Sequence, residues 1–285
     1  MHGAVIDSSA NPTVKALRAL TTTKGRREQR RFLVEGVRAV EEGLRAGYVP
    51  AVCLYNPELL ARTERGQALL TSLRKLRTDT GKPPMLLEAS VRALQSASDT
   101  VHPQGIVAAF PIVDREPPTP APAPALALIC DAIQDPGNLG TILRAAEAAG
   151  VHAVWLSPDC VDVYSPKVVR SAMGAHFRLP IYPNSDWPQI ERAVQMLGVP
   201  ATRIFGTDAA ARQSYDEVDW LQPAALIISN EAHGISQQAR LLAEGGGGLV
   251  CIPMMGGTES LNAAIAAAVN LFEAARQRRR KQGCV

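Results

Sequence analysis

The residues best suited to chemistry fall into three short segments in the second half of this 285-residue chain. They read DPGNLGTILR at 135–144, ISNEAHG at 228–234 and IPMMGGTESLN at 252–262. Each places polar side chains at the carboxyl end of an apolar run, which is where open α/β sheets bind their ligands. The three segments together indicate one site far more strongly than any of them alone.

In the first segment, Pro136-Gly137 forces a turn, and Asn138 is a favourable N-cap for the helix that follows. Arg144 lies off the apolar stripe of that helix. There its guanidinium could hold a phosphate through two parallel hydrogen bonds. An ordinary exposed helix arginine would fit the same pattern, so the segment alone leaves both interpretations open.

The second and third segments add a carboxylate, amides and a hydroxyl. Glu231 and Asn230 follow an apolar run, and the alternative for Glu231 is a capping hydrogen bond. His233 fits a plain surface position better than a proton carrier. Ser260 is the expected N-cap of the last helix, whose alanine-rich face would let a second helix approach closely. Asn262 completes the polar pair at the start of that helix.

Clustered cations mark further candidate contacts for phosphate. Lys167 and Arg170 lie on the first two turns of a short expected helix, where simple capping is the alternative. The run 24–31 reads KGRREQRR, and the run 276–281 reads RQRRRK. A solvated basic face or tail would explain either run. In the first run, the candidate phosphate contacts are Arg26, Arg27, Arg30 and Arg31.

These residues need a scaffold, and the second half of the chain alternates apolar strand patterns with helical ones. Strands are expected at 126–130, 153–156, 203–206, 225–229 and 249–252, with a weaker one at 177–181. Helices are expected at 139–149, 166–174, 187–197, 236–243 and 261–277. Unbroken apolar strands between helices predict a parallel sheet that is covered on both faces.

The first half reads as a smaller α/β domain. Helices are expected at 12–21 and 36–46 and over much of 57–77, and strands at 32–35, 52–55, 85–88 and 106–110. Alternating prolines at 115–124 predict an extended, semi-rigid linker. The expected domains are therefore 1–114 and 125–285.

Composition excludes several classes of protein. The net charge of +3 is too small to diagnose a nucleic-acid partner, and 46% hydrophobic residues fit a soluble globular chain. Five cysteines without a CxxC pair favour a reducing cytoplasm, with no disulfide framework and no metal site. We expect no signal peptide and no association with a membrane. The glycine fingerprints of dinucleotide-binding folds and P-loops do not occur, which argues against a nucleotide-dependent dehydrogenase.

The three segments resemble the motifs of the SpoU/TrmH family of RNA ribose methyltransferases, which belongs to the SPOUT class. DPGNLGTILRAAEAAG, ISNEAHGIS and IPMMGGTESLNAAIAAA match the three motifs in order and spacing. The run NPTVKALRAL…RRFLVEGVRAVEEGL resembles the substrate-binding domain of the family. The resemblance implies an α/β fold with a deep trefoil knot that forms an S-adenosylmethionine pocket. It also implies a homodimer whose active site is built from both subunits.

Matched position by position, the resemblance assigns roles to individual residues. The implied catalytic set is Asn138, Arg144, Glu231, Ser260 and Asn262. The implied cofactor contacts are Ser229, Asn230, Gly234, Ile252, Met254 and Leu261. Ser229 stands where the family usually has glycine, and its Cβ could crowd the cofactor.

The implied reaction methylates a ribose 2′-hydroxyl, with ribosomal RNA favoured over tRNA as the substrate. Because a guanidinium is a poor base, we assign Arg144 to positioning the nucleotide phosphate, and a phosphate or Glu231 to taking the proton. One alternative is a SPOUT enzyme that methylates a base nitrogen. Another is a catalytically silent RNA-binding or ribosome-associated protein.

Overall fold

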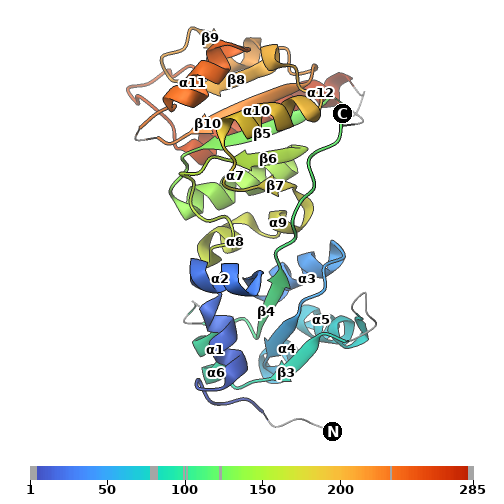
Figure 1. Cartoon of the computed structure of the whole chain (residues 1–285). Coiled ribbons are helices and arrows are strands. Elements are labelled where there is room, and N and C mark those ends of the chain that lie inside the picture. The colour runs from blue at the N-terminus through green and yellow to red at the C-terminus, as the bar shows by residue number, and fades with distance from the viewer. Residues whose placement is uncertain are drawn as a thin grey trace. The chain divides into compact units, whose positions relative to one another are not determined.

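The computed structural model describes residues 5–77, 83–98, 100, 102–121, 124–231 and 233–281. Two compact units make up the chain (Figure 1). Unit 1 comprises Met1–Asp114 and Tyr164–Phe177, and unit 2 comprises Arg115–Val163 and Arg178–Val285. The sequence-based division assigned residues 164–177 to the second domain, whereas the structure packs this segment with the first. Cys284 lies outside the described residues.

Unit 1 is built on a four-stranded sheet in the order β1-β4-β2-β3. Its strands are β1 (Arg31–Glu35), β2 (Val52–Tyr55), β3 (Met85–Glu88) and β4 (Ile106–Pro111). β4 pairs antiparallel with β1 and β2, and β2 pairs parallel with β3. All four expected strands are therefore present, within one residue of the expected bounds.

Helices cover both faces of the unit 1 sheet because successive strand residues point to opposite sides. Leu33 and Leu54 pack with α1 (Pro12–Ala19) and α6 (Val91–Ala97). On the other face, buried residues of β1, β2 and β4 pack with three helices, which are α3 (Val37–Arg45), α4 (Pro57–Ala61) and α5 (Glu64–Lys75). The segment 57–77 is thus two helices, because Thr63 caps a new helix after α4 ends. The sequence analysis missed α6 and also α2 (Thr23–Gln29).

The segment Tyr164–Phe177 completes the second of these cores with α8 (Pro166–Ala172) and most of α9 (Ala175–Arg178). The Phe177 ring lies 4.9 Å from that of Phe110, and the Tyr164 ring lies 5.1 Å from that of Phe32. The strand expected at 177–181 is wrong over most of its length. A turn at Met173-Gly174 starts α9, which buries Phe177 and leaves only Ile181–Tyr182 as strand β7.

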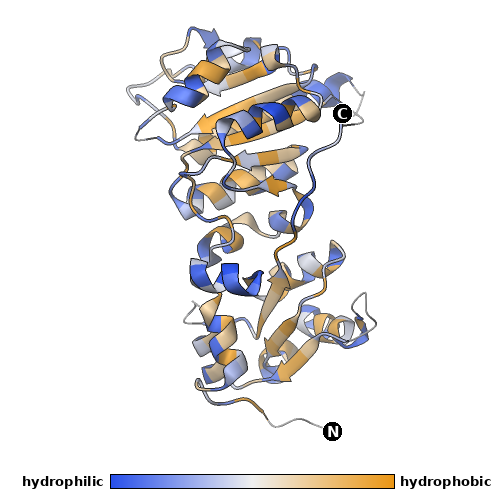
Figure 2. Ribbon diagram, in the orientation of Figure 1, coloured by the Kyte–Doolittle hydropathy of each residue, from blue (hydrophilic) through white to orange (hydrophobic). Residues whose placement is uncertain are grey.

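Unit 2 contains a seven-stranded sheet in the order β7-β6-β5-β10-β8-β11-β9, with every neighbouring pair parallel. The remaining strands are β5 (Leu126–Asp131), β6 (Ala153–Leu156), β8 (Ile204–Thr207), β9 (Gln213–Ser214), β10 (Ala224–Ser229) and β11 (Gly248–Cys251). Figure 2 shows that β10 is mostly hydrophobic, and every residue of β5 and β10 is buried, as expected for strands covered on both faces. The expected α/β class with a parallel sheet is confirmed.

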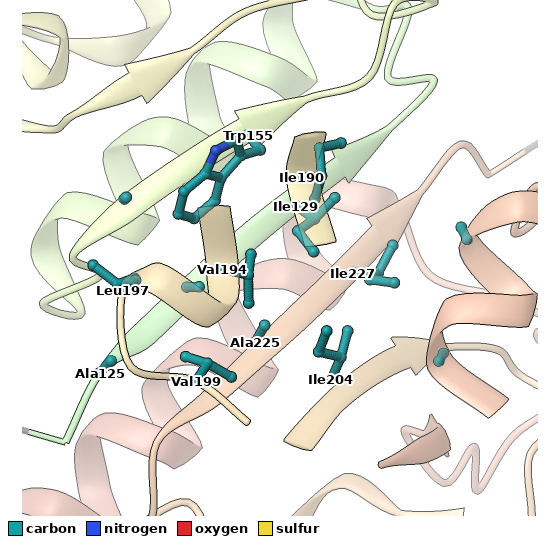
Figure 3. Packing of buried hydrophobic residues seen from close by; sticks show 14 residues of the cluster. Ala125, Ile129, Trp155, Ile190, Val194, Leu197, Val199, Ile204, Ala225 and Ile227 are labelled. Atoms are coloured by element: carbon teal, nitrogen blue, oxygen red, sulfur yellow. The ribbon is translucent and has the colours of Figure 1, made fainter. Parts of the chain in front are cut away.

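Helices lie on both faces of this sheet. On one face, α10 (Trp187–Met196) and α11 (Gln237–Glu244) pack on a core that includes Ile129, Ile204 and Ile227 (Figure 3). The other face is covered by α7 (Pro136–Ala148) and α12 (Ala263–Lys281), which contact each other. Short 3₁₀ turns at Ala201–Arg203 and Tyr215–Glu217 precede β8 and follow β9.

The proline-rich segment expected as a linker lies against unit 2. Its described residues 115–121 form no regular secondary structure. Two hydrogen bonds hold them, because the Tyr182 hydroxyl donates to the Glu116 carbonyl at 2.9 Å and the Ala121 amide donates to the Leu197 carbonyl at 3.2 Å. Pro122 and Ala123 of the expected linker lie outside the described residues.

Candidate active site

The three polar segments follow strands β5, β10 and β11, whose carboxyl ends lie at one edge of the parallel sheet of unit 2. The chain places β10 between β5 and β8, although β6 to β9 separate β5 from β10 along the sequence. Such a change in strand order opens a crevice at the carboxyl edge of a sheet. The structure therefore brings the three segments together where the sequence analysis expected a site.

A hydrogen-bonded network joins one residue from each segment. The Asn138 side-chain amide donates to Glu231 Oε1 at 2.9 Å, and the Asn262 side-chain amide donates to Asn138 Oδ1 at 3.0 Å. Glu231 Oε1 also accepts from the Ala263 backbone amide at 2.5 Å. The carboxylate thus satisfies the first exposed N–H of α12 and fixes Asn138 at the start of α7.

Two expected helix caps are wrong. Asp135, rather than Asn138, caps α7, because its side chain accepts from the Asn138 backbone amide at 2.8 Å and Pro136 starts the helix. Asn262, rather than Ser260, caps α12, accepting from the Ala264 and Ile265 amides at 3.0 and 3.3 Å. Each shift frees a polar side chain. The Asn138 side chain enters the network, and Ser260 is left to line the neighbouring pocket.

A pocket of about 270 Å³ lies beside the network. All six residues assigned to the cofactor by resemblance line it: Ser229, Asn230, Gly234, Ile252, Met254 and Leu261. Glu231 and Ser260 of the implied catalytic set also line it. The aliphatic wall suits a purine ring. The carboxylates of Glu231 and Asp208 suit a cation such as a sulfonium or an ammonium. The residues present therefore fit S-adenosylmethionine.

Ser229 need not obstruct this pocket. Its hydroxyl donates to Asp131 Oδ2 at 3.1 Å, across the β5–β10 pair in which the two residues are directly opposite. Because Ser229 lies two residues beyond Ile227, its side chain continues the face of the sheet that α10 and α11 cover. The hydroxyl thus has a partner on the neighbouring strand.

The sequence analysis missed the wall that β8 and α11 contribute. Thr207, Asp208 and Arg240 line the pocket, and the Arg240 guanidinium pairs with Asp208. Burial disfavours the charge of Asp208, but hydrogen bonds from the Ala210 amide and Arg240 hold the pKa of this carboxyl below its ordinary value. A signal was present in the sequence, because Thr207-Asp208 ends an apolar strand at the same edge as the three segments.

Arg144 is the one residue of the implied catalytic set that lies apart. It is exposed on α7, and within the described part of the chain it makes no hydrogen bond or ion pair. It lies six positions after Asn138, which is about 9 Å along the helix axis. It is not among the residues that line the pocket.

The candidate RNA contacts lie in unit 1, and one of them is wrong. Arg26 is only 3% exposed, and its guanidinium donates to the Leu20 carbonyl at 2.8 Å and to the Thr23 hydroxyl at 3.1 Å. It holds the turn between α1 and α2 and is not available to a phosphate. Arg30 is exposed and pairs with Asp114 at 2.5 Å, which raises the pKa of the arginine.

The other candidate cations remain accessible. Arg27 and Lys167 are exposed, whereas Arg31 and Arg170 are partly buried. Since α8 contacts β1 within unit 1, the cations of the run 24–31 and those of α8 belong to the same compact unit although about 140 residues separate them in the sequence.

The C-terminal basic run is a helix in the structure, since α12 continues to Lys281. Arg276 pairs with Glu273 at 2.6 Å, and Arg278 donates to four backbone carbonyls. Only the last three cations of the run, Arg279, Arg280 and Lys281, are exposed. The interpretation of this run as a flexible tail is therefore wrong.

The described cysteines Cys53, Cys130, Cys160 and Cys251 are free thiols, and burial raises the pKa of Cys53 to about 12. Among the described residues, no group of three or more histidine, cysteine, aspartate or glutamate side chains could hold a metal ion. Every helix in the described part of the chain falls short of what a membrane span requires.

Comparisons with known proteins agree with this geometry. Residues 125–272 match the SpoU rRNA Methylase family, and residues 11–108 match the MRM3-like substrate binding domain. The chain is 33% identical to the mitochondrial rRNA methyltransferase 3 of Mus musculus, over 90% of this chain and 70% of that protein. It is 32% identical to the 23S rRNA (guanosine(2553)-2′-O)-methyltransferase RlmP of Bacillus subtilis, over 94% of this chain and 97% of that protein.

Among solved structures, the SpoU methyltransferase AviRb from Streptomyces viridochromogenes, in complex with AdoMet, superposes with a TM-score of 0.80 at 31% identity. The match covers 95% of this chain and 100% of AviRb. These findings confirm the resemblance and the expected cofactor, S-adenosylmethionine. The chain belongs to the SpoU family of methyltransferases and carries an N-terminal region of the MRM3-like substrate-binding type.

Proposed function

We propose that this protein transfers the methyl group of S-adenosylmethionine to a ribose 2′-hydroxyl of ribosomal RNA. The observation that carries the proposal is the Asn138–Glu231–Asn262 network, which lies beside a pocket lined by all six residues expected to contact the cofactor. Support for the substrate comes from the rRNA methyltransferases of mouse and B. subtilis that the chain resembles along most of its length.

When bound, S-adenosylmethionine supplies an electrophilic methyl group, and the protein must orient the acceptor hydroxyl in line with it. We assign this task to the network. Glu231 Oε1 accepts two hydrogen bonds and is thereby fixed, while Oε2 has no hydrogen bond within the described chain. Oε2 is therefore the atom of this chain that we assign as proton acceptor, and a substrate phosphate is the alternative.

Arg144 requires a different explanation because it lies outside the pocket. We infer a homodimer in which Arg144 of one subunit serves the pocket of the other and holds the nucleotide phosphate there. Two exposed apolar side chains support a partner surface on α12, namely Ile265 at 52% and Phe272 at 50% exposure. They are seven residues apart and so share one face of the helix. The trefoil knot implied by the resemblance belongs to the same proposal.

Unit 1 is proposed to deliver the RNA through Arg27, Arg30, Arg31, Lys167 and Arg170. The proline-rich segment is the proposed boundary between this delivery domain and the catalytic one. Free thiols support a reducing compartment, and we propose the cytoplasm. Fractionation of the native cells, with the protein detected by antibody, tests the compartment.

Incubation of the purified protein with labelled S-adenosylmethionine and ribosomal RNA tests the reaction. Mass mapping should find one new 2′-O-methyl nucleoside. Label on a base nitrogen, on tRNA alone, or on no RNA would contradict the proposal. Arg144→Ala and Arg144→Lys should both lower kcat/KM by about 10²-fold or more while cofactor affinity stays near normal, because a lysine cannot reproduce bidentate contact with phosphate. Near-normal turnover of both variants would remove Arg144 from the assignment.

The RNA surface is tested by charge reversal. Arg27→Glu combined with Lys167→Glu should weaken RNA binding by about tenfold or more and reduce the slope of log K against log salt by about 2. Filter-binding titrations at several salt concentrations measure both quantities. Arg279→Glu with Arg280→Glu is a matched control outside the proposed surface. Equal effects of the two double variants would show that total charge, rather than this surface, governs binding.

A further inference from the structure

Asp131 is a buried carboxylate at the carboxyl end of β5 that none of the catalytic or cofactor assignments uses. It is 2% exposed. Its Oδ2 atom accepts from the Ser236 backbone amide at 2.7 Å and from the Ser229 hydroxyl at 3.1 Å. Within the described chain it forms no ion pair with a cation. A buried polar atom without a hydrogen-bond partner is costly, and these two donors satisfy the buried carboxyl oxygen.

The two donors are the residues that flank the loop 230–235. Ser229 ends β10, and Ser236 is the N-cap of α11. One carboxylate oxygen therefore fastens both ends of a six-residue loop to the neighbouring strand. We call these two hydrogen bonds the Asp131 link.

The loop closed by the Asp131 link carries much of the pocket. Its pocket-lining residues are Asn230, Glu231, His233, Gly234 and Ile235. Two further hydrogen bonds hold residues near the ends of the loop. The Asn230 side-chain amide donates to the Ala132 carbonyl at 3.1 Å, and the Gly234 amide donates to the Asn230 carbonyl at 2.9 Å. The Asp131 link and these contacts together hold the two ends of the loop in place. Ala232 of the loop lies outside the described residues.

The backbone beside Asp131 also takes part in holding the loop. Ala132 has a φ of 53°, a backbone conformation that residues other than glycine rarely adopt. This turn presents the Ala132 carbonyl to Asn230, and the Ser157 hydroxyl accepts from the Ala132 amide at 2.9 Å. Strain of this kind persists where surrounding contacts enforce it, and such places are common at functional sites.

We propose that Asp131 is a positioning residue of the cofactor pocket: through Ser229 and Ser236 it holds the loop 230–235 in the shape that binds S-adenosylmethionine. The proposal rests on the cofactor site described above. It assigns Asp131 no contact with the cofactor and no role in proton transfer. Its effect should therefore fall on cofactor affinity, with little effect on turnover once the pocket is filled.

The test compares Asp131→Ala, Asp131→Asn and Ser229→Ala in the full-length protein. Calorimetric titration with S-adenosylmethionine should show that Asp131→Ala weakens binding by about tenfold or more, since both hydrogen bonds of the Asp131 link are lost. Asp131→Asn retains one acceptor oxygen and should recover part of the affinity. Ser229→Ala removes the hydroxyl that makes the 3.1 Å bond and keeps the backbone and Cβ of this pocket-lining residue. It should weaken binding by about threefold, and this test remains if Asp131→Ala fails to fold.

Three further measurements separate positioning from general stability. In steady-state assays, KM for S-adenosylmethionine should rise while kcat at saturating cofactor stays within about threefold of wild type. Amide hydrogen exchange in the cofactor-free protein should become faster in the loop 230–235. The matched control Ser185→Ala deletes a hydrogen bond of another buried serine, from its hydroxyl to the Tyr182 carbonyl at 3.1 Å, away from the pocket and the loop. It should lower thermal stability but leave cofactor affinity unchanged.

Wild-type cofactor affinity in folded Asp131→Ala or in Ser229→Ala, or unchanged loop exchange, would overturn the proposal. These outcomes differ from failure of the site itself, since a wild-type protein whose loop amides gain no protection on addition of S-adenosylmethionine would refute the pocket assignment. A fall in kcat equal to the rise in KM would also overturn the proposal, because it would place Asp131 in the chemical step.

Discussion

The two ends of α12 have polar surroundings of opposite kinds. At its start, Asn262 and the Ala263 amide join a network with Asn138 and Glu231 beside the pocket. Near its other end, about 24 Å away along the axis, Arg278 donates to the carbonyls of Pro124, Ala125, Trp220 and Gln222 at 2.8 to 3.2 Å. Asn262 at the first end is exposed and belongs to the implied catalytic set, whereas Arg278 near the other end is partly buried.

The two ends of α12 differ in the partners of their polar side chains. Burial, followed by the nearby Arg203 charge, lowers the pKa of Arg278, and four carbonyls together replace the water that its guanidinium has lost. Gln277 strengthens the same end, accepting from the Trp220 amide at 2.9 Å. The C-terminal end therefore stabilises the fold, while the N-terminal end keeps donors and acceptors that a substrate can still reach.

The largest expected effect is loss of activity at the N-terminal end. Asn262→Ala removes the bond to Asn138 and the cap of α12, so we expect kcat/KM to fall about 10²-fold, equivalent to about 2.7 kcal/mol. The lost cap should cost about 1 kcal/mol of unfolding free energy. Methylation assays and urea unfolding measure the two quantities. Asn262→Asp retains a capping oxygen and should restore stability but not activity. A variant with normal activity would show that the network is purely structural.

At the C-terminal end of α12 we expect a loss of stability without a loss of activity. Arg278→Ala removes four hydrogen bonds and leaves the partly buried Trp220 carbonyl without its donor, so it should lower the free energy of unfolding by about 2 to 3 kcal/mol, with kcat per folded molecule unchanged. Denaturant titration measures the loss. Arg280→Ala, an exposed neighbour on the same helix, should change stability by less than about 0.5 kcal/mol. If the two variants are equally stable, the four carbonyl contacts contribute nothing and the comparison fails.

The smallest expected effect is a pH dependence of the free energy of unfolding, which arises from a histidine close to Arg278. His152 Nδ1 accepts from the Leu126 amide at 3.1 Å, and burial together with the Arg278 charge lowers the pKa of the imidazole. Because the unfolded histidine binds a proton near pH 6.5, stability should be complete above that pH and should fall as the pH drops below it. His152→Gln, which cannot titrate, should show a weaker decline between pH 7 and 5. Identical declines would exclude His152 as their source.

Much of the site could be predicted because three segments end strands of one parallel sheet, and such ends must meet at one edge. The cap of α7 was also predictable, because Asp135 and Asn138 are both good caps and a proline favours the first helical position, which selects Asp135. In contrast, Arg26 and Arg278 could not be distinguished from their basic neighbours. Which cation of a run turns inward depends on carbonyls supplied by distant segments of the chain.

The glycine run 245–248 shows the same limit. The sequence predicts a flexible loop, but a side chain at Gly246 would meet the Ala201 carbonyl at 2.5 Å, and one at Gly247 would meet the Phe205 ring at 2.6 Å. These glycines permit close packing between α11 and β8. Composition alone does not distinguish a glycine kept for packing from one kept for mobility.

The packing of Tyr164–Phe177 has a practical consequence for anyone who wishes to express the methyltransferase half alone. A fragment cut at the prolines would retain this segment but lose the β-sheet residues Phe32 and Phe110 that cover its aromatic rings. Tyr164 and Phe177 would then be exposed to water as an apolar patch that promotes aggregation. In a soluble fragment, the whole segment Tyr164–Phe177 should instead be replaced by a short polar linker.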